Sequence, residues 1–359
     1  MNKWKYTTLG KISEIITGPF GSQLHQSDYV EQGIPVVMPQ DIDDRKVNYV
    51  AINYVANKDA IRLERYKTIT NDILYARRGD VEKHAFIGRK DSGALCGTGC
   101  LRVRITTPEV EPEFVSFFLN KKETRKWLVT HAVGTNMPNL NTDILSEVPI
   151  AYPLIGEQRK MVRVLNSLDR KIAINSAIND NLEQQAKLLY DYWFTQFDFP
   201  DESGKPYRSS GGKMVWNEQL KMEIPFSWVC SKMENAIEAV RTGLNPRNNF
   251  KLGNGNIQYI TVKNLCLNGS LDFSGCDTID EQARQIIHRR SDIQIDDILF
   301  ASIAPLGRCY LIQENPTNWD INESVFSIRY NSSVLTAEYL YMNLQSEAFV
   351  KRATACSTG

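Results

Sequence analysis

The sequence lacks a net charge, a long hydrophobic run and any paired arrangement of its cysteines. Its 42 basic residues balance 42 acidic residues, so no overall basic field indicates a nucleic-acid partner. The seven cysteines are scattered without CxxC spacing, which indicates neither a disulfide framework nor a zinc site. No apolar stretch approaches the roughly 18 residues of a membrane helix, and the N-terminus has no signal-peptide core. We expect a cytoplasmic protein.

The chain also lacks the motifs of enzymes that act on DNA. An amino-methyltransferase needs an Asn/Asp-Pro-Pro-Tyr/Phe loop and a glycine-rich cofactor turn, and neither is present. The run Asp80-Val81-Glu82-Lys83 resembles a nuclease carboxylate cluster only loosely. We expect no catalytic residue, no metal site and no cofactor of its own. Two alternative functions stay open for the chain. One is a DNA methyltransferase or nuclease acting on its own, and the other is a coiled-coil scaffold that does not bind DNA.

A repeat is the most informative feature that is present. Thr17-Gly18 recurs at Thr242-Gly243, and Asn71-Asp72-Ile73-Leu74 recurs as Asp296-Asp297-Ile298-Leu299, both with an offset of 225 residues. Three further stretches match in the same order, namely residues 36–42 with 259–265, 101–104 with 326–329, and 113–115 with 338–340. These colinear matches predict two homologous copies of one fold.

The repeated unit combines strand and helix patterns. β-branched and aromatic runs at residues 34–38, 73–76 and 100–105 are bounded by Gly, Asp and Pro, which predicts strands, and an apolar face over residues 113–129 predicts a helix. The expected fold class is α+β, with two homologous mixed α/β domains joined by a long coiled-coil-forming helix. The predicted boundaries are 1–153 for the first domain, 154–199 for the helix and 200–359 for the second domain.

The segment between the copies has a different character. Residues 157–197 contain no proline and no glycine, and apolar residues recur there in heptads, which predicts a helix of coiled-coil type. Two asparagines interrupt the seam and would fix register and partner orientation. The predicted seam positions are Met161, Leu165, Leu168, Ile172, Asn175, Asn179, Leu182, Ala186, Leu189 and Trp193.

The order of these parts and several short motifs resemble the specificity subunits of type I restriction-modification systems. The junction Val148-Pro149-Ile150-Ala151-Tyr152-Pro153-Leu154-Ile155-Gly156-Glu157-Gln158-Arg159 is similar to the proline-rich, Glu-Gln start of that family's central conserved helix. Leu9-Gly10-Lys11-Ile12 and Asn71-Asp72-Ile73-Leu74 resemble motifs of its recognition domains. The resemblance covers essentially the whole chain.

The resemblance implies a subunit that recognises DNA without catalysing a reaction. Each repeat would be a target recognition domain that reads one half of a bipartite site in double-stranded DNA, and the long helix would set the gap between the halves. The helix would also bind methyltransferase (modification) subunits, and separate restriction subunits would cleave the DNA. S-adenosylmethionine, ATP and Mg are accordingly expected on the partner subunits.

One departure from the family concerns the end of the sequence. Complete members carry a second conserved helix after the second recognition domain, packed antiparallel against the first, whereas this sequence stops at Gly359. Leaving Leu and Ile side chains in water would cost about 1.5 to 3 kcal/mol each relative to burial. We therefore expect self-association through the central helix, with a second copy of the chain as the simplest partner.

Base reading requires side chains that offer two hydrogen-bonding groups on loops that enter a groove, chiefly Arg for guanine and Asn or Gln for adenine. Polar residues of this kind stand at corresponding loop positions in the two copies but differ in identity, as expected if the copies read different half-sites. The candidate DNA-binding residues are Ser22, Gln23, Gln40, Arg77, Arg78, Thr135 and Asn136 in the first copy, and Asn245, Arg247, Lys263, Asn264, Ser302 and Thr358 in the second.

Overall fold

The computed structural model describes residues 4–134 and 138–356. The chain divides into two compact units, Met1–Ala173 and Ile174–Gly359. The unit boundary therefore falls inside the long helix, which contributes residues to both units. The boundaries 1–153, 154–199 and 200–359 stay a prediction.

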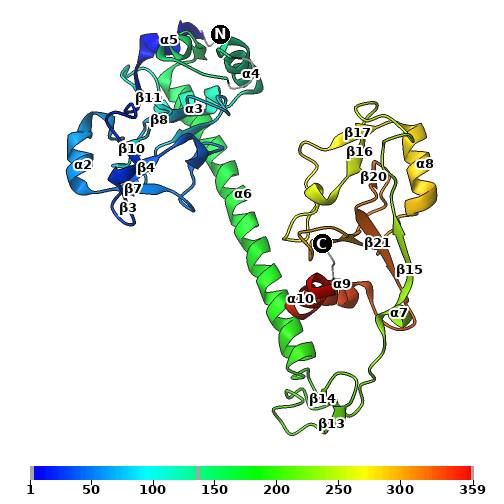
Figure 1. Ribbon diagram of the computed structural model, residues 1–359. Helices are drawn as coiled ribbons and strands as arrows, with labels where there is room; N and C mark the ends of the chain where they lie inside the picture. The colour runs from blue at the N-terminus through cyan, green and yellow to red at the C-terminus, as the bar shows by residue number, and fades with distance from the viewer. Residues whose placement is uncertain (1–3, 135–137, 357–359) are drawn as a thin grey trace. The chain divides into compact units, whose positions relative to one another are not determined.

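The first unit contains two four-stranded sheets (Figure 1). One is antiparallel in the order β2-β11-β8-β9, and the other has the order β10-β4-β7-β3, with β10 parallel to β4. Two smaller pairs, β1-β12 and β5-β6, complete its strands. The strands are β1 (Lys5–Thr8), β2 (Ser13–Thr17), β3 (Tyr29–Val30), β4 (Ile34–Val37), β5 (Ile42–Asp43), β6 (Lys46–Val47), β7 (Asn53–Val55), β8 (Ile73–Ala76), β9 (His84–Phe86), β10 (Leu95–Cys96), β11 (Cys100–Ile105) and β12 (Pro149–Tyr152).

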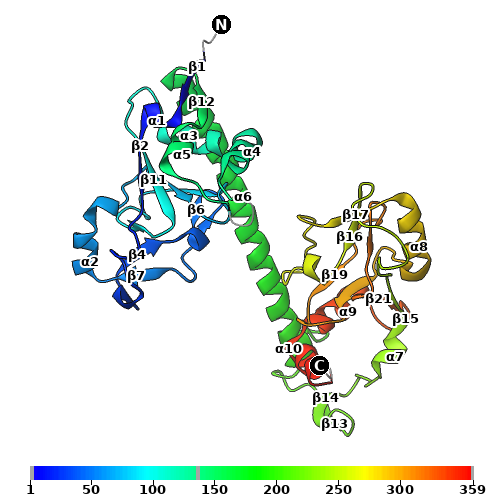
Figure 2. The same cartoon turned by 45° about the horizontal axis from the view of Figure 1, so that its top comes forward.

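Short helices cover this unit. Helices α3, α4 and α5 gather near β1 and β12, whereas α2 lies beside β4 and β7 (Figure 2). The helices are α1 (Leu9–Ile12), α2 (Asn57–Arg62), α3 (Pro112–Leu119), α4 (Lys122–His131) and α5 (Thr142–Ser146), with 3-10 turns η1 (Gln26–Asp28), η2 (Pro39–Asp41) and η3 (Glu64–Tyr66).

The helix predicted over residues 113–129 is divided into α3 and α4. Lys121 has an extended backbone with φ −63° and ψ 142°, so the first helix ends before it. The side chain of Asn120 bonds to Arg125 and to Asp44, which holds the break. The single-helix prediction was wrong, since the contact with Asp44, 76 residues away in sequence, is not visible in the local pattern.

The second unit repeats the topology of the first. Its antiparallel sheet has the order β15-β21-β18-β19, and its mixed sheet has the order β17-β16-β20 with β16 parallel to β20. A hairpin, β13-β14, precedes them. The elements are β13 (Met214–Asn217), β14 (Met222–Pro225), α7 (Met233–Ala236), β15 (Ile237–Thr242), β16 (Ile257–Ile260), η5 (Val262–Asn264), β17 (Asp277–Ile279), α8 (Glu281–Ser291), β18 (Ile298–Ala301), β19 (Cys309–Leu311), β20 (Trp319–Ile321), β21 (Val325–Tyr330), α9 (Ala337–Gln345) and α10 (Glu347–Cys356).

Strand register agrees between the units along most of the β2-β11 and β15-β21 pairs, up to a β-bulge between Ile237 and Ala239 that shifts it in the second unit. Leu101 pairs with Thr17 in the first unit, and Phe326 pairs with Thr242 in the second. Because each of these residues lies 225 positions after its counterpart, the repeat in sequence is a repeat in structure. The predicted α+β class with two homologous domains is confirmed.

One ion pair recurs in both units and ties the antiparallel sheet together. Arg104 donates from Nε and Nη2 to Asp72 at 2.8 and 2.7 Å, and Arg329 donates to Asp297 at 2.9 Å through the same two atoms. Both carboxylates are buried, and these hydrogen bonds raise the pKa of each arginine. A buried carboxylate needs such a bidentate partner to offset its desolvation.

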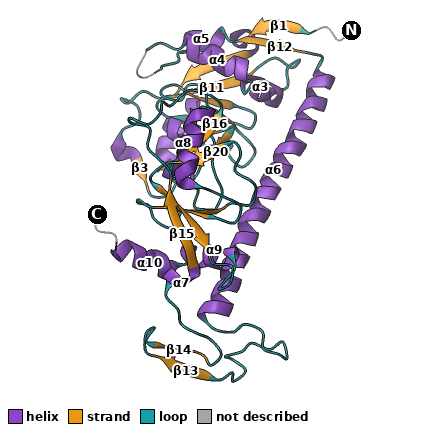
Figure 3. Cartoon of the chain, turned by 90° about the vertical axis from the view of Figure 1, so that its right-hand side faces the viewer, coloured by secondary structure: helices purple, strands orange, loops and turns teal. Residues whose placement is uncertain are grey.

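The long helix α6 (Ile155–Tyr190) is continuous over 36 residues (Figure 3) and is followed by a π-helical turn, η4 (Asp191–Thr195). At 1.5 Å per residue it is roughly 54 Å long. Its only buried residues within the described chain are Gln158 and Val162. The predicted long helix is thus confirmed. None of the described helices combines the length and the apolar character needed to cross a membrane.

Gln158, the glutamine of the Glu-Gln junction, attaches the start of α6 to the first unit. Its side chain is fully buried. Oε1 accepts from the Glu111 backbone N–H at 2.9 Å, and Nε2 donates to the carbonyl oxygens of Glu109 and Pro153 at 2.9 and 2.8 Å. One buried amide therefore bonds to three backbone groups at once.

Candidate nucleic-acid interface

Three loops of the first unit converge on the turn formed by residues 97–99. Thr98 Oγ1 donates to the Pro19 carbonyl at 2.9 Å, so the loop after β2 is held there. Gly97 N donates to Val37 O at 2.9 Å, and Arg77 N donates to Gly99 O at 2.8 Å. The loops that follow β2, β4 and β8 therefore lie together at one end of the two sheets.

The second unit builds the same convergence around residues 322–324. Gly243 N donates to Asn322 O at 3.1 Å, and Asn322 N donates to Ile260 O at 2.9 Å. Ser302 donates to Ser324 O from both its backbone N–H, at 3.0 Å, and its hydroxyl, at 2.7 Å. A hollow of about 440 Å³ opens beside these loops, and its lining includes Lys263 and Asn322.

Two equivalent glycines permit this close approach. A Cβ on Gly18 would overlap the carbonyl oxygen of Gly97, and a Cβ on Gly243 would overlap the carbonyl oxygen of Ile321. Only glycine lets a loop pass so near another backbone. The recurrence of Thr-Gly in the sequence is thus explained by the shared convergence.

Gln40 and Lys263 occupy equivalent exposed positions at the convergences. Each is the middle residue of a 3-10 turn, η2 or η5, and each side chain faces solvent. Their neighbours Asp41 and Asn264 are buried and close those turns: Asp41 Oδ2 accepts from Met38 N at 2.8 Å, and Asn264 Oδ1 accepts from Thr261 N at 2.9 Å. Asn264 Nδ2 donates to Asp272 O at 2.9 Å, so its side chain is committed to the turn.

The other candidates of the first unit differ in how free their side chains are. Ser22 and Arg78 are exposed, whereas Arg77 is half-buried and its Nε has no hydrogen-bond partner within the described residues. Gln23 is exposed, but its Oε1 accepts from Tyr66 Oη at 2.9 Å. Two further candidates, Thr135 and Asn136, lie outside the described residues.

In the second unit Arg247 is exposed, and Asn245 and Ser302 are half-buried. Thr358 lies outside the described residues. The structure thus brings the loops of the described candidates together in each unit, although these residues are far apart in sequence.

Sequence reasoning missed several residues of the convergent loops. Phe20 and Ile303 are apolar yet 57% and 56% exposed there, and Thr98 and Glu323 stand at equivalent positions in the two central turns. The signal that could have found them is the repeat itself, because Ile303 lies 225 residues after Arg78 and Glu323 lies 225 after Thr98.

A polar chain links the first unit to α6. His84 Nε2 lies 3.0 Å from Ser116 Oγ, which also accepts from Arg45 Nε at 3.0 Å, and Arg45 Nη1 donates to Asp169 Oδ2 at 2.9 Å. Burial, with the nearby charges of Arg45 and Arg125, lowers the pKa of His84 to about 3. A neutral histidine therefore belongs to the contact that orients this domain on the helix.

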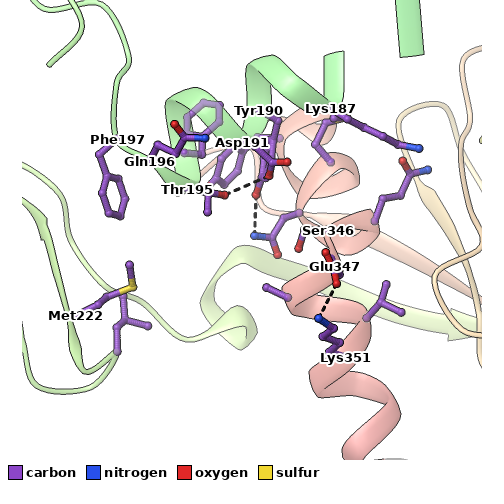
Figure 4. Close-up of a pocket in the computed structure, with 18 of the residues that line it drawn as sticks. Lys187, Tyr190, Asp191, Thr195, Gln196, Phe197, Met222, Ser346, Glu347 and Lys351 are labelled. Carbon is purple, nitrogen blue, oxygen red and sulfur yellow. Dashed lines mark hydrogen bonds and ion pairs between the residues drawn. The ribbon is translucent and has the colours of Figure 1, made fainter. Parts of the chain in front are cut away.

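The end of α6 is held within the second unit by aromatic side chains. A hollow of about 1330 Å³ lies where the helix end faces α9, α10 and the β13-β14 hairpin (Figure 4). Tyr190 Oη accepts from Asn343 Nδ2 at 3.0 Å, and the rings of Phe194 and Tyr339 meet edge to face, 4.9 Å apart. These contacts fix the helix end rather than presenting donors to a nucleic acid.

The predicted seam side chains of α6 are largely uncovered. Apolar members are 36% to 68% exposed, with Leu165 and Ile172 at the two limits, and Asn175 and Asn179 are also exposed. Trp193, in η4, is half-buried. The pairing of this seam stays a prediction.

Residues capable of metal binding or thiol chemistry do not assemble into a site. No group of three or more His, Cys, Asp or Glu side chains that could hold a metal ion occurs in the part of the chain that the structure describes. Burial raises the pKa of the Cys96 thiol to about 12, which keeps it protonated. Cys96 and Cys100 pack as small buried residues beneath the turn.

Comparison with known proteins agrees with this architecture. A family model described as "Type I restriction modification DNA specificity domain" matches residues 1–184, which is just over half of the chain. In fold, the chain is similar to the crystal structure of a type-I restriction-modification system S subunit from M. genitalium. The TM-score is 0.51 at 15% identity, over 99% of this chain and 81% of that chain.

Two curated relatives carry matching names. The chain is similar to the "Type I restriction enzyme MjaIX specificity subunit" of Methanocaldococcus jannaschii, with 29% identity over 44% of this chain and 34% of the relative. It is also similar to the "Type I restriction enzyme HindI specificity subunit" of Haemophilus influenzae, with 25% identity over 55% of this chain and 42% of the relative. The matched part spans less than half the length of either relative. By the extent of the family match and the paired domains, the chain belongs to the type I restriction modification DNA specificity domain family.

Proposed function

We propose that this chain is the DNA sequence-recognition subunit of a type I restriction-modification complex, with no catalytic activity of its own. Each domain reads one half of a bipartite site through its convergent loops. The observation that carries the proposal is that equivalent loop positions converge in both domains while their exposed residues differ. The shared frame places the loops, and the differing side chains allow different half-sites to be read.

The exposed side chains suit base reading. The amide of Gln40 can donate to and accept from adenine in the major groove, and the guanidinium of Arg78 can donate twice to guanine. Lys263, at the position equivalent to Gln40, can donate to the acceptors of guanine. One domain thus favours a different base from the other at the matching place.

Helix α6 supplies the spacing and the assembly surface in this proposal. A helix without proline or internal glycine is stiff, so its length converts into a defined gap between half-sites. Its uncovered seam is available to methyltransferase subunits or to a second copy of the chain. S-adenosylmethionine, ATP and Mg act on the partner subunits, which perform methylation and cleavage in the cytoplasm.

Matched substitutions at the two turns test the proposal. The chain is expressed with methyltransferase subunits, and methylome sequencing reports the modified motif for wild type, Gln40→Ala and Lys263→Ala. We expect a bipartite motif in which Gln40→Ala relaxes one half and Lys263→Ala relaxes the other, each mismatch position losing about 1 to 3 kcal/mol of discrimination.

Two outcomes contradict the proposal. Equal changes in both halves from a single substitution would show that the domains do not read separately. Methyl transfer by the purified chain without partners would show that it is itself the enzyme.

A further inference from the structure

The second unit contains a small basic pocket outside the convergent loops. It lies between β15 and α8, has a volume of about 470 Å³, and is lined by Arg241, Arg284, Gln285, His288, Arg289 and Asp292. All six residues belong to the same unit, so the pocket is a property of this domain alone.

Positive charge dominates the lining. Three arginines and a histidine face a single carboxylate, Asp292, which already bonds to Arg329 at 3.0 Å and lies 3.3 Å from Arg241. Arg289 is exposed, and no hydrogen bond or ion pair engages it among the described residues. Glu281 and Asp320, which do not line the pocket, pair with Arg284 and His288, so among the described residues Arg289 is the lining arginine whose charge has no ion-pair partner.

The pocket is built on rigid parts. His288 is held by Asp320, whose Oδ2 lies 3.2 Å from Nδ1, and Asp320 is fully buried. Arg284 Nη2 donates to the Pro316 carbonyl at 2.9 Å, while its Nε is buried without a hydrogen-bond partner in the described structure. Arg284 Nη1 also lies 3.7 Å from Glu281 Oε1, so this guanidinium is fixed in place beside the pocket and lends it rigidity.

The pocket adjoins the convergent loops along two strands. Arg241 stands two residues before Gly243, and Asp320 stands two residues before Asn322. At about 3.3 Å per strand residue, an anion in the pocket would lie within roughly one nucleotide step of the loop side chains. A DNA backbone that presents its bases to those loops carries phosphates at this spacing.

In the described part of the first unit, the positions equivalent to this lining carry different residues. Ile16 occupies the position equivalent to Arg241, and α2 has six residues where α8 has eleven. The basic pocket is therefore not part of the shared frame that both domains need in order to fold.

We propose that this pocket binds a phosphate group of the DNA backbone beside the half-site read by the second domain. The inference rests on the proposed function and adds to it an asymmetry, since only one domain has this anchor. Phosphate is the fitting ligand because arginine guanidinium groups bind it bidentately. Such a contact strengthens binding without reading sequence.

Arg289→Gln and Arg241→Gln test the pocket, with Arg290→Gln as the matched control. Arg290 is exposed and neighbours Arg289 in the last turn of α8, where it shares any interaction with the helix dipole, but it does not line the pocket. Binding of the full chain with its methyltransferase subunits to a duplex bearing the methylated motif is measured across salt concentrations.

We expect the slope of log affinity against log salt to fall by about 0.9 for each lost phosphate contact. Between roughly 50 and 200 mM salt, Arg289→Gln would then lose about 3- to 4-fold less affinity than wild type. Arg290→Gln should retain the wild-type slope, and the methylated motif should be unchanged in every variant. Equal slopes for all four chains would overturn the pocket.

Inorganic phosphate at fixed ionic strength separates the two sources of the anion. Stabilisation of the wild-type chain by phosphate that is lost in Arg289→Gln, with no change in the DNA salt slope, would overturn DNA as the source. Failure of the proposed function looks different, because the wild-type complex would then show no preference for any bipartite sequence.

Discussion

The two domains share their strands and buried contacts and differ in the exposed residues of their convergent loops. The strand order of the antiparallel sheet recurs, and the buried Asp-Arg pair and the closely approached glycine recur with an offset of 225 residues. The loop positions do not: Gln40 faces solvent where the second domain has Lys263, and Arg78 where it has Ile303. The elements that build the fold are therefore repeated, whereas the exposed residues of the convergent loops differ.

The largest effect is expected from breaking the shared ion pair. Arg104→Met and Arg329→Met each leave a buried carboxylate without its partner, which costs about 3 to 5 kcal/mol of unfolding free energy in the affected domain. Denaturant titration followed by hydrogen exchange assigns the loss to a domain. Arg89→Met, at an exposed site, is the control, and a loss confined to one of the two pair variants would break the equivalence.

Gln158→Ala tests the attachment of α6 to the first domain, which distinguishes that domain from the second. The substitution strips three backbone groups of their partners, so we expect the first domain to lose about 2 to 4 kcal/mol while the second is unaffected. Gln184→Ala on the exposed part of the same helix is the matched control. Equal stability of the two variants in urea unfolding would contradict the anchoring role of Gln158.

Gly18→Ala and Gly243→Ala probe the convergences at equivalent places. The added Cβ would overlap a carbonyl oxygen in each case, and relief by backbone shifts should cost about 1 to 3 kcal/mol. Thermal unfolding measures the cost, and the methylome should show loss of the half-site belonging to the altered domain. Gly156→Ala, where a Cβ meets open space, should leave the methylome unchanged and should not lower the thermal stability, because alanine favours the helix more than glycine does.

The smallest effect, over the range from pH 7 to pH 5.5, concerns acid sensitivity, which differs between the domains. His84 in β9 is replaced at the equivalent position of β19 by the buried Cys309. Because the pKa of His84 falls from 6.5 to about 3 on folding, the unfolded state binds more protons between these values. The free energy of unfolding should then decrease as the pH is lowered through this window, by about 1.4 kcal/mol per pH unit.

His84→Gln should flatten this dependence in the first domain without changing the second. Denaturant unfolding at pH 5.5 and pH 7 measures the difference, and carboxylates contribute equally to both chains. An identical pH dependence in wild type and variant would rule out a buried neutral histidine.

The sequence by itself determined the repeat of the two domains and the long helix between them. Colinear matches at offsets of 225 and 223 residues predict two copies of one fold, and the absence of proline and glycine over 157–197 with apolar heptads predicts a long helix. Both follow from patterns in the order of residues along the chain. The candidate loop residues were also found in this way, because the same loop positions could be compared between copies.

Only the tertiary structure decided which of these residues meet. The parallel pairings of β10 with β4 and of β20 with β16 bring loops together that are separated by many residues, and no local pattern specifies such pairings. The same long-range placement committed Asn264 to a turn, divided α3 from α4 at Asn120, and gathered Arg241, Arg284 and Arg289 around one pocket. The sequence states which side chains are present. Which of them lie close together in space depends on the order of the strands in the sheets.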